Sequence, residues 1–94
     1  MAEEKRLENK LVKAVKERGG LALKLISPGF DGLPDRLVLI DVGKIAFVEV
    51  KAPGKKPRKL QEVRIRQLRE LGFLVYVLDD ERKIGGIINE ICTT

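Results

Sequence analysis

The fold is decided by the stretch 32-GLPDRLVLIDVGKIAFVEVK-51. Two short apolar runs within it, 36–40 and 44–50, predict two strands. Asp41-Val42-Gly43 between them predicts a three-residue hairpin loop, because the third residue of such loops is commonly left-handed and glycine suits that conformation. The stretch therefore predicts an antiparallel hairpin with charged residues at its open end.

The length of the hairpin loop determines which side chains meet at that open end. A three-residue loop pairs Ile40 with Lys44 and places Asp35 directly opposite Glu49. Lys51 shares the face of Glu49 because side chains alternate with a period of two. A two-residue loop would shift the register by one and move Asp35 to the other face. With the glycine favouring three residues, we predict that two carboxylates and one ammonium group lie together.

Both faces of the predicted hairpin are apolar, so we expect the sheet to be covered on both sides. The residues are Leu37, Leu39, Ile45 and Phe47 on one face, and Val38, Ile40, Ala46 and Val48 on the other. Two carboxylates held together at the edge of such a sheet repel each other, and a bound divalent cation relieves that repulsion. This end of the hairpin is therefore our candidate metal-binding site.

The flanking sequence supplies the remaining elements of one α/β domain that spans residues 1–94. Helical spacing predicts helices at 3–18 and 58–71, the second with an inner face of Leu60, Val63, Leu68 and Leu71. Strands are expected at 21–27 and 73–78, the latter central or well covered, and a further helix from Ile84 onward. Because 44–78 reads as strand–helix–strand, it predicts a parallel pair and hence a mixed sheet flanked by helices.

Positive charge is concentrated in one segment. Residues 51–69 hold eight basic residues and one acid, a net charge of +7, whereas the whole chain carries +5. Such a segment on a near-neutral body suggests a polyanion partner, most often nucleic acid, although a solvated basic surface is an equal alternative from charge alone. The predicted DNA contacts are Lys55, Lys56, Arg58, Lys59, Arg36 and Arg66.

Missing residue types narrow the chemistry further. The chain has no histidine, one cysteine (Cys92) and one serine (Ser27), which excludes histidine-based catalysis and thiolate metal clusters. Carboxylates and lysines remain, and they suit a hard cation such as Mg²⁺ or Mn²⁺. No secretory segment or run of about 18 apolar residues is present, so we expect a soluble, cytoplasmic protein, of cellular or viral origin. Small domains often oligomerise for stability, so we also expect a homodimer.

The motif residues resemble a known nuclease family. Pro34-Asp35 followed by Glu49-Val50-Lys51 is similar to the signature of the PD-(D/E)xK nuclease superfamily. The wider set, from Gly32 to Arg36, then Glu49 to Lys51, then Gln61 after a basic loop, resembles the VRR-NUC domain. A glutamate on the first helix, Glu8, also matches, although helical spacing allows Glu4 in its place.

That resemblance implies Mg²⁺- or Mn²⁺-dependent DNA cleavage on a restriction-endonuclease-like αβββαβ core. It implies catalytic roles for Asp35, Glu49, Lys51, Gln61 and Glu8. The expected metal ligands are Asp35, Glu49, Glu8 and the carbonyl of Val50. Stand-alone members of this size resemble Holliday-junction resolvases, which suggests branched DNA as the substrate. A flap or linear-duplex nuclease and a DNA-binding module without catalysis are the alternatives.

Overall fold

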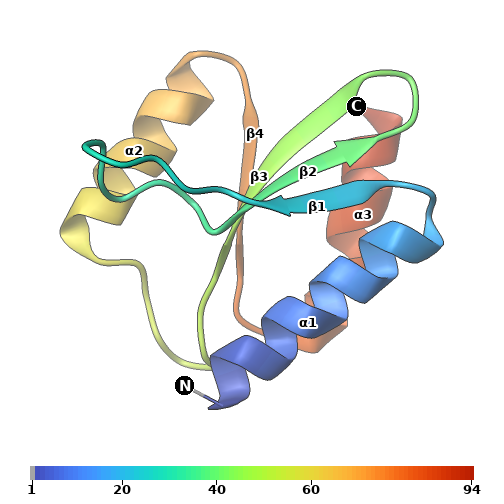
Figure 1. Ribbon diagram of the computed structural model, residues 1–94, viewed down its shortest axis with the longest axis horizontal. Coiled ribbons are helices and arrows are strands. Elements are labelled where there is room, and N and C mark those ends of the chain that lie inside the picture. Colours follow the sequence, from blue (N-terminus) through green and yellow to red (C-terminus); the bar gives the residue numbers. More distant parts are fainter. Residues whose placement is uncertain (1) are drawn as a thin grey trace.

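The computed structural model describes residues 2–94 as three helices around one four-stranded sheet (Figure 1). The elements are α1 (Ala2–Glu17), β1 (Leu21–Lys24), β2 (Arg36–Ile40), β3 (Lys44–Val50), α2 (Lys59–Glu70), β4 (Leu74–Leu78), a 3₁₀ turn η1 (Glu81–Lys83) and α3 (Ile84–Thr93). The order αβββαβ followed by a helix confirms the predicted α/β class. No helix in this part of the chain is both long and apolar enough to cross a membrane.

The sheet is mixed, with strand order β1-β2-β3-β4. β1 and β2 are antiparallel, β2 and β3 are antiparallel, and β3 and β4 are parallel. Ile40 pairs with Lys44 and Arg36 with Val48, which confirms the predicted hairpin register. Gly43 has a positive φ of 69°, as expected, and Val42 beside it also lies in the left-handed region at 64°.

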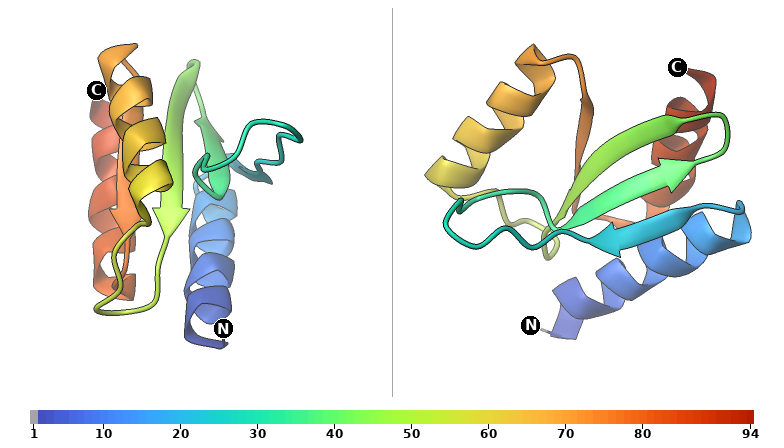
Figure 2. Two further views of the ribbon diagram at one scale, coloured as in Figure 1. Left: turned by 90° about the vertical axis from the view of Figure 1, so that its left-hand side faces the viewer. Right: turned by 45° about the horizontal axis from the view of Figure 1, so that its top comes forward.

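The main core lies between one face of the sheet and the helices α1 and α3. Leu7, Leu11 and Val15 of α1 are buried together with the isoleucines of α3 and with alternate residues of the strands, namely Val38, Ile40, Ala46, Val48 and Val50. α2 lies apart from the other two helices and packs against β4 at the opposite face (Figures 1 and 2). This arrangement brings the end of β3 between α1 and α2.

The strand predicted at 73–78 to be central or well covered is an edge strand that both α2 and α3 contact, so it is covered as predicted. Two other sequence predictions about these elements are wrong. β1 ends at Lys24 and not at residue 27, because its partner strand β2 extends no further than Arg36. α2 buries Gln61 and Ile65, whereas Leu60 and Leu71 of the predicted inner face are exposed.

The expectation that both faces of the hairpin are covered is also wrong. The side chains of Val38, Ile40, Ala46 and Val48 are buried, whereas those of Leu37, Leu39, Ile45 and Phe47 are only partly buried or exposed. The reason is that α2 covers only the β3–β4 side of its face and leaves β1 and β2 open. One face of the sheet is therefore core, and much of the other is surface.

Candidate active site

Asp35 lies at the open end of the β2–β3 hairpin, where the confirmed register places it opposite Glu49. Its Oδ2 accepts a hydrogen bond of 2.8 Å from the backbone N–H of Val50. This bond ties the start of β2 to the end of β3. The Lys51 N–H donates to the carbonyl of Leu78 at 2.9 Å, which fixes the backbone that carries the lysine.

Glu49 is the most deeply buried charged residue of the site, with 1% of its surface exposed. Its Oε2 accepts hydrogen bonds from the side-chain amide of Gln61 at 2.8 Å and lies 3.2 Å from Nζ of Lys51. Its Oε1 is buried and has no hydrogen-bond partner among residues 2–94. An unsatisfied buried carboxylate oxygen is costly, so Oε1 marks a position that a cation would stabilise.

Gln61 is fixed in its orientation by the first turn of α2. Its Oε1 accepts the backbone N–H of Arg58 at 2.8 Å, the arrangement by which the third residue of a helix caps its own N-terminus. Because a backbone N–H can only donate, the side-chain oxygen must face Arg58, and the NH₂ group then faces Glu49. Helix capping therefore aims Gln61 at the carboxylate.

Burial raises the pKa of both carboxyl groups. For Glu49, burial and the neighbouring charge of Asp35 raise the pKa to about 7, although Lys51 opposes the shift. For Asp35, burial raises the pKa, the hydrogen bond from Val50 lowers it, and the charges of Glu8 and Glu4 raise it. A cation bound between these two carboxyl groups would stabilise their ionised forms.

Glu8 does not join the two carboxylates in this structure, because it forms an ion pair with Arg36. Glu8 Oε2 lies 2.7 Å from Arg36 Nε, and Arg36 Nη1 donates to the carbonyl of Ala22 at 3.0 Å. The alternation of the strand points Arg36 to the α1 face, opposite to the face that carries Glu49. Glu8 and Arg36 are therefore engaged with each other, although the sequence predicted a metal-binding role for the first and a DNA-binding role for the second.

Glu4 is one helical turn before Glu8, and its charge raises the pKa of both Asp35 and Glu49. The sequence left these two glutamates open as alternatives. Within residues 2–94, no three acidic, histidine or cysteine side chains lie close enough together to form a ready metal cluster. Mg²⁺ is commonly held by one or two carboxylates with water and substrate phosphate completing its shell, so Asp35 and Glu49 with the free Oε1 fit such an ion.

The loop before Asp35 is held by a residue that sequence reasoning missed. Arg64 of α2 lies over the ring of Phe30, 3.7 Å from its centroid, and its Nε donates to the carbonyl of Asp31 at 2.8 Å. Gly32 packs so closely on α2 that an added Cβ would lie 2.8 Å from Cγ of Leu60. In the sequence Arg64 is one of many basic residues in the segment, and no local pattern distinguishes it.

The predicted DNA-binding residues other than Arg36 lie on the surface beside the site. Lys55 and Lys56 are in the loop between β3 and α2, Arg58 and Lys59 begin the helix, and Arg66 is on its outer side. All five side chains are exposed. The positive segment therefore starts at Lys51 inside the site and extends outward along one continuous stretch of chain.

The raised pKa of Glu49 gives a pH dependence of stability with a defined sign. A carboxyl group whose pKa is higher in the folded state stabilises the fold fully at pH values below its unfolded pKa, which for glutamate is near 4.5. This stabilisation is lost as the pH rises to about 7, the pKa of Glu49 in the folded state. In metal-free buffer, Glu49→Gln should therefore gain up to about 3 kcal/mol of unfolding free energy over wild type at pH 8, and far less at pH 4. Urea unfolding of both proteins at the two pH values measures this, with Glu62→Gln, an exposed glutamate on α2, as control. An equal difference at both pH values would contradict the assignment.

Comparison with known proteins is consistent with this arrangement. The VRR-NUC domain family matches residues 1–80. A protein of Acyrthosiphon pisum secondary endosymbiont phage 1, named "Putative nuclease p44", is 49% identical over 75 residues, which are 80% of this chain and 81% of that protein. A solved structure of a VRR_NUC domain superposes with a TM-score of 0.88 at 32% identity and covers 93% of this chain and 95% of its own.

These matches confirm what the residues 32–36, 49–51 and 61 had suggested from sequence. The family match and the structural match each cover most of the chain. The chain belongs to the VRR-NUC domain family and is a nuclease.

Proposed function

We propose that this nuclease is a Mg²⁺- or Mn²⁺-dependent endonuclease that cuts branched DNA, four-way junctions foremost, as a homodimer. The observation that carries the proposal is the pair of half-buried Asp35 and buried Glu49 with an unpartnered oxygen on Glu49, next to Lys51 and at the start of an exposed basic segment. A domain that only bound DNA would have no use for two neighbouring carboxyl groups whose pKa values are raised by burial.

Each residue of the site has a role that its contacts support. Asp35 and Glu49 are the proposed ligands, with the Val50 carbonyl and Glu8 as further candidates. A bound divalent cation would supply charge neutralisation at the scissile phosphate and a more acidic water. Lys51 places an ammonium group beside Glu49, where it can donate to a phosphate oxygen or orient the attacking water. Gln61 holds the Glu49 carboxylate in one orientation.

Metal binding can be tested without activity. Addition of Mg²⁺ or Mn²⁺ should raise the melting temperature of the wild type at pH 8, because a ligand that binds only the folded state stabilises it. The same addition should have little effect on a variant that carries both Asp35→Asn and Glu49→Gln. Equal stabilisation of wild type and double variant would reject these two residues as the ligands.

The choice of substrate follows from symmetry. Resolution of a four-way junction requires two matched cuts, and one chain offers one site. A symmetric dimer supplies two equivalent sites related by a two-fold axis. Incubation of the protein with labelled four-way junction, flap and linear duplex in Mg²⁺ or Mn²⁺ decides among the candidates. Paired incisions at the junction centre support the proposal, and cutting confined to flap or duplex supports the alternative nuclease.

Binding of the junction without cutting in either metal would instead favour a DNA-binding module without catalysis. This alternative has the basic segment in its favour, because phosphate contacts alone supply substantial non-specific affinity. The placement of Glu49, Lys51 and Gln61 supports a catalytic role, because none of these three side chains is exposed. A pure binder would present its charges at the surface.

Removal of three lysines from the basic segment should change the salt dependence of DNA binding. Lys55, Lys56 and Lys59 replaced together by alanine should reduce the slope of log K against log salt by about 3, close to one unit per lost phosphate contact. A triple alanine variant of Lys5, Lys13 and Lys16, exposed lysines on α1, carries the same charge change and serves as control. Fluorescence anisotropy over a series of salt concentrations gives both slopes. A larger change in the control would show that DNA approaches α1.

A further inference from the structure

The loop between β1 and β2 carries a phenylalanine that is not part of the core. Phe30, in the middle of the segment 28-PGFDG-32, is 45% exposed. The other two phenylalanines, Phe47 and Phe73, pack edge-to-face on each other with ring centroids 5.6 Å apart. The loop itself stands out from the rest of the molecule in the turned view (Figure 2, left). The fold therefore leaves one aromatic ring at the surface, away from the other two.

Arg64 of α2 holds this ring in one position. Its guanidinium lies over one face of the Phe30 ring, 3.7 Å from the centroid, and its Nε donates to the carbonyl of Asp31 at 2.8 Å. Arg64 Nη1 also donates to Oε1 of Gln67 at 3.1 Å, so the arginine is fixed on the helix. An aromatic side chain that is ordered before binding loses less conformational entropy when a ligand stacks on it. The exposed part of Phe30 is therefore a preorganised surface for a ligand.

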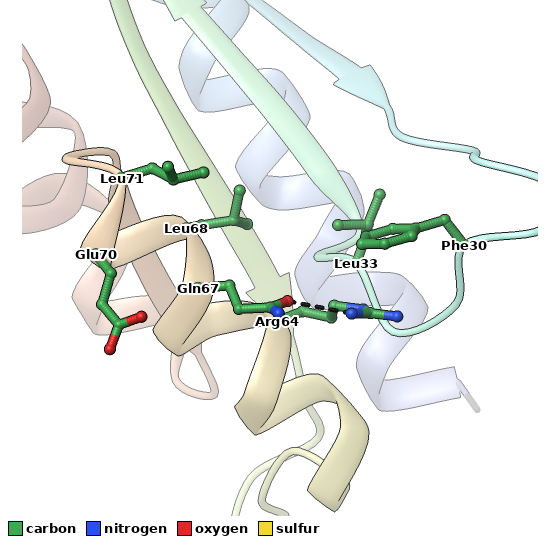
Figure 3. Close-up of a pocket in the computed structure, with 7 residues that line it drawn as sticks. All are labelled: Phe30, Leu33, Arg64, Gln67, Leu68, Glu70 and Leu71. Carbon is green, nitrogen blue, oxygen red and sulfur yellow. Dashed lines mark hydrogen bonds between the residues drawn. The ribbon is translucent and has the colours of Figure 1, made fainter.

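Phe30 forms one wall of a hollow of about 490 Å³ between the loop and α2, which we call the loop hollow. The apolar residues that line it come from both elements and are Phe30, Leu33, Leu68 and Leu71. The two leucines of α2 lie across the hollow from the two loop residues (Figure 3). The side chains of Gln67 and Glu70 line the same hollow and add polar groups to it.

A nucleobase matches this lining. It is planar, so it can stack on an aromatic ring, and its edge carries hydrogen-bond donors and acceptors. The oxygen of the Gln67 amide accepts from Arg64, which leaves the NH₂ group of Gln67 for an acceptor on the base. The carboxylate of Glu70 can accept from an exocyclic amino group. Stacking together with hydrogen bonds to the base edge is the way in which proteins hold an unpaired base.

The loop hollow lies beside the path of the substrate, because the loop ends at the catalytic end of the hairpin. Phe30 is five residues before Asp35, and five residues of extended chain span at most about 17 Å. A base on Phe30 is therefore within about five base pairs of a phosphate at the carboxylates, since base pairs are spaced by about 3.4 Å. Exposed lysines at the end of β1 (Lys24) and at the start of α2 (Lys59) add positive charge on either side of the loop in the chain.

The depth of the hollow favours a base that has left the stack. A base inside a duplex is stacked on both sides, and it reaches a hollow beside the helix only if it is extruded. Extrusion costs least for a base that is unpaired or lacks a stacking neighbour, which is the situation at a branch point. A residue that stacks on such a base therefore distinguishes branched from linear DNA, whereas contacts with phosphates do not.

We propose that the loop hollow takes one unpaired base of a branched DNA and that this base stacks on the ring of Phe30. The inference rests on the proposed function, because it explains how branched DNA is selected, but it needs no second copy of the chain. Phe30 provides the selectivity for the branch, and the basic segment provides affinity for DNA of any shape.

Tryptophan at position 30 reports stacking directly, because the chain has no tryptophan of its own. Emission of Phe30→Trp should fall at least about twofold when a four-way junction with unpaired thymines at its centre binds in Ca²⁺, and much less with linear duplex. Val42→Trp is the matched control, since Val42 is 91% exposed in the turn at the other end of the β2–β3 hairpin. Emission of Phe30→Trp that the junction leaves unchanged, or an equal fall in Val42→Trp, would overturn the proposal.

Two smaller side chains at position 30 separate stacking from apolar packing. Phe30→Ala and Phe30→Leu should each bind the junction about tenfold more weakly than wild type and bind linear duplex equally well, because leucine is apolar but cannot stack. Phe30→Trp should keep the affinity of wild type for the junction. Fluorescence anisotropy in Ca²⁺ gives these affinities. Full junction affinity in Phe30→Leu, or an equal loss for junction and duplex, would contradict a stacked base.

Junction cleavage by the wild type is a separate measurement. If the wild type cuts the junction while the emission of Phe30→Trp and the affinity of Phe30→Leu do not change, the stacked base is refuted and the proposed function stands. If the wild type cuts only linear duplex, the proposed function fails whatever the variants at position 30 show. The two failures are therefore distinguishable.

Discussion

Replacement of Glu49 by glutamine is expected to slow cleavage of a four-way junction by at least about 10³-fold, or about 4 kcal/mol of transition-state stabilisation. Glutamine keeps the size of the side chain and its ability to meet Gln61, but it removes the negative charge that would hold the cation. DNA affinity should change by less than about threefold, because Glu49 is 1% exposed and makes no contact at the surface. Single-turnover cleavage and anisotropy in Ca²⁺ separate the two effects.

A matched substitution controls for the chemistry of the change. Glu62 is exposed on α2, one residue after Gln61, and Glu62→Gln should cleave at nearly the wild-type rate. Asp35→Asn should be as inactive as Glu49→Gln, since the register places both side chains at one site. Cleavage by Glu49→Gln within tenfold of wild type would remove this carboxylate from the mechanism.

The same substitution should make the metal-free protein more stable at neutral pH. Ionisation of the Glu49 carboxyl group is unfavourable because the group is buried, and its pKa is therefore raised to about 7. Enzymes commonly keep such destabilising groups where function requires them. Loss of activity together with a gain in stability would show that the inactive variant is folded and that the glutamate serves the reaction.

The hairpin could be predicted from sequence because its geometry is local. Three residues between two apolar runs, the last of them glycine, leave few registers open, and the structure has the expected one. The register in turn places Asp35 against Glu49, so the centre of the candidate site follows from the spacing of a few neighbouring residues. The interaction of Gln61 with Glu49 is nearly as local, because it depends on the first turn of a helix that begins soon after β3.

What could not be predicted depends on how distant elements pack. Both faces of the hairpin are apolar in sequence, and nothing in the alternation says that α2 covers only the side near β4. The stripe of Leu60, Leu68 and Leu71 fits helical spacing, yet the helix turns Gln61 and Ile65 toward the sheet instead. An apolar stripe that stays exposed has the same sequence pattern as one that is buried.

The ion-pair partner of Glu8 likewise could not be predicted from the sequence. Whether a glutamate on α1 reaches Asp35 or Arg36 depends on the rotation of the helix over the sheet, and both residues lie at the same strand end. The structure pairs it with Arg36 at 2.7 Å. Of the three carboxylates predicted for the metal site, Asp35 and Glu49 therefore face each other, whereas Glu8 pairs with Arg36.

Gly32→Ala is expected to destabilise the protein by about 3 kcal/mol and to slow cleavage by about 10²-fold. Gly32 has a φ of +89°, which alanine adopts only with strain, and its added Cβ would lie 2.8 Å from Cγ of Leu60 and 3.3 Å from the Leu60 carbonyl carbon. Because the near atoms include the backbone of α2, the helix cannot yield by rotating one side chain. The loop must move instead, and it carries Asp35 three residues later.

Gly29→Ala separates strain from packing. Gly29 has nearly the same φ, +80°, in the same loop, but its added Cβ would meet nothing within 4 Å. It should therefore cost only the backbone strain, about 1 kcal/mol, and leave the cleavage rate close to that of wild type. Urea unfolding and single-turnover cleavage of the two variants give the comparison. Equal losses in both would mean that the contact of Gly32 with α2 does not position Asp35, and a stable but inactive Gly32→Ala would show that the contact acts on the site more than on the fold.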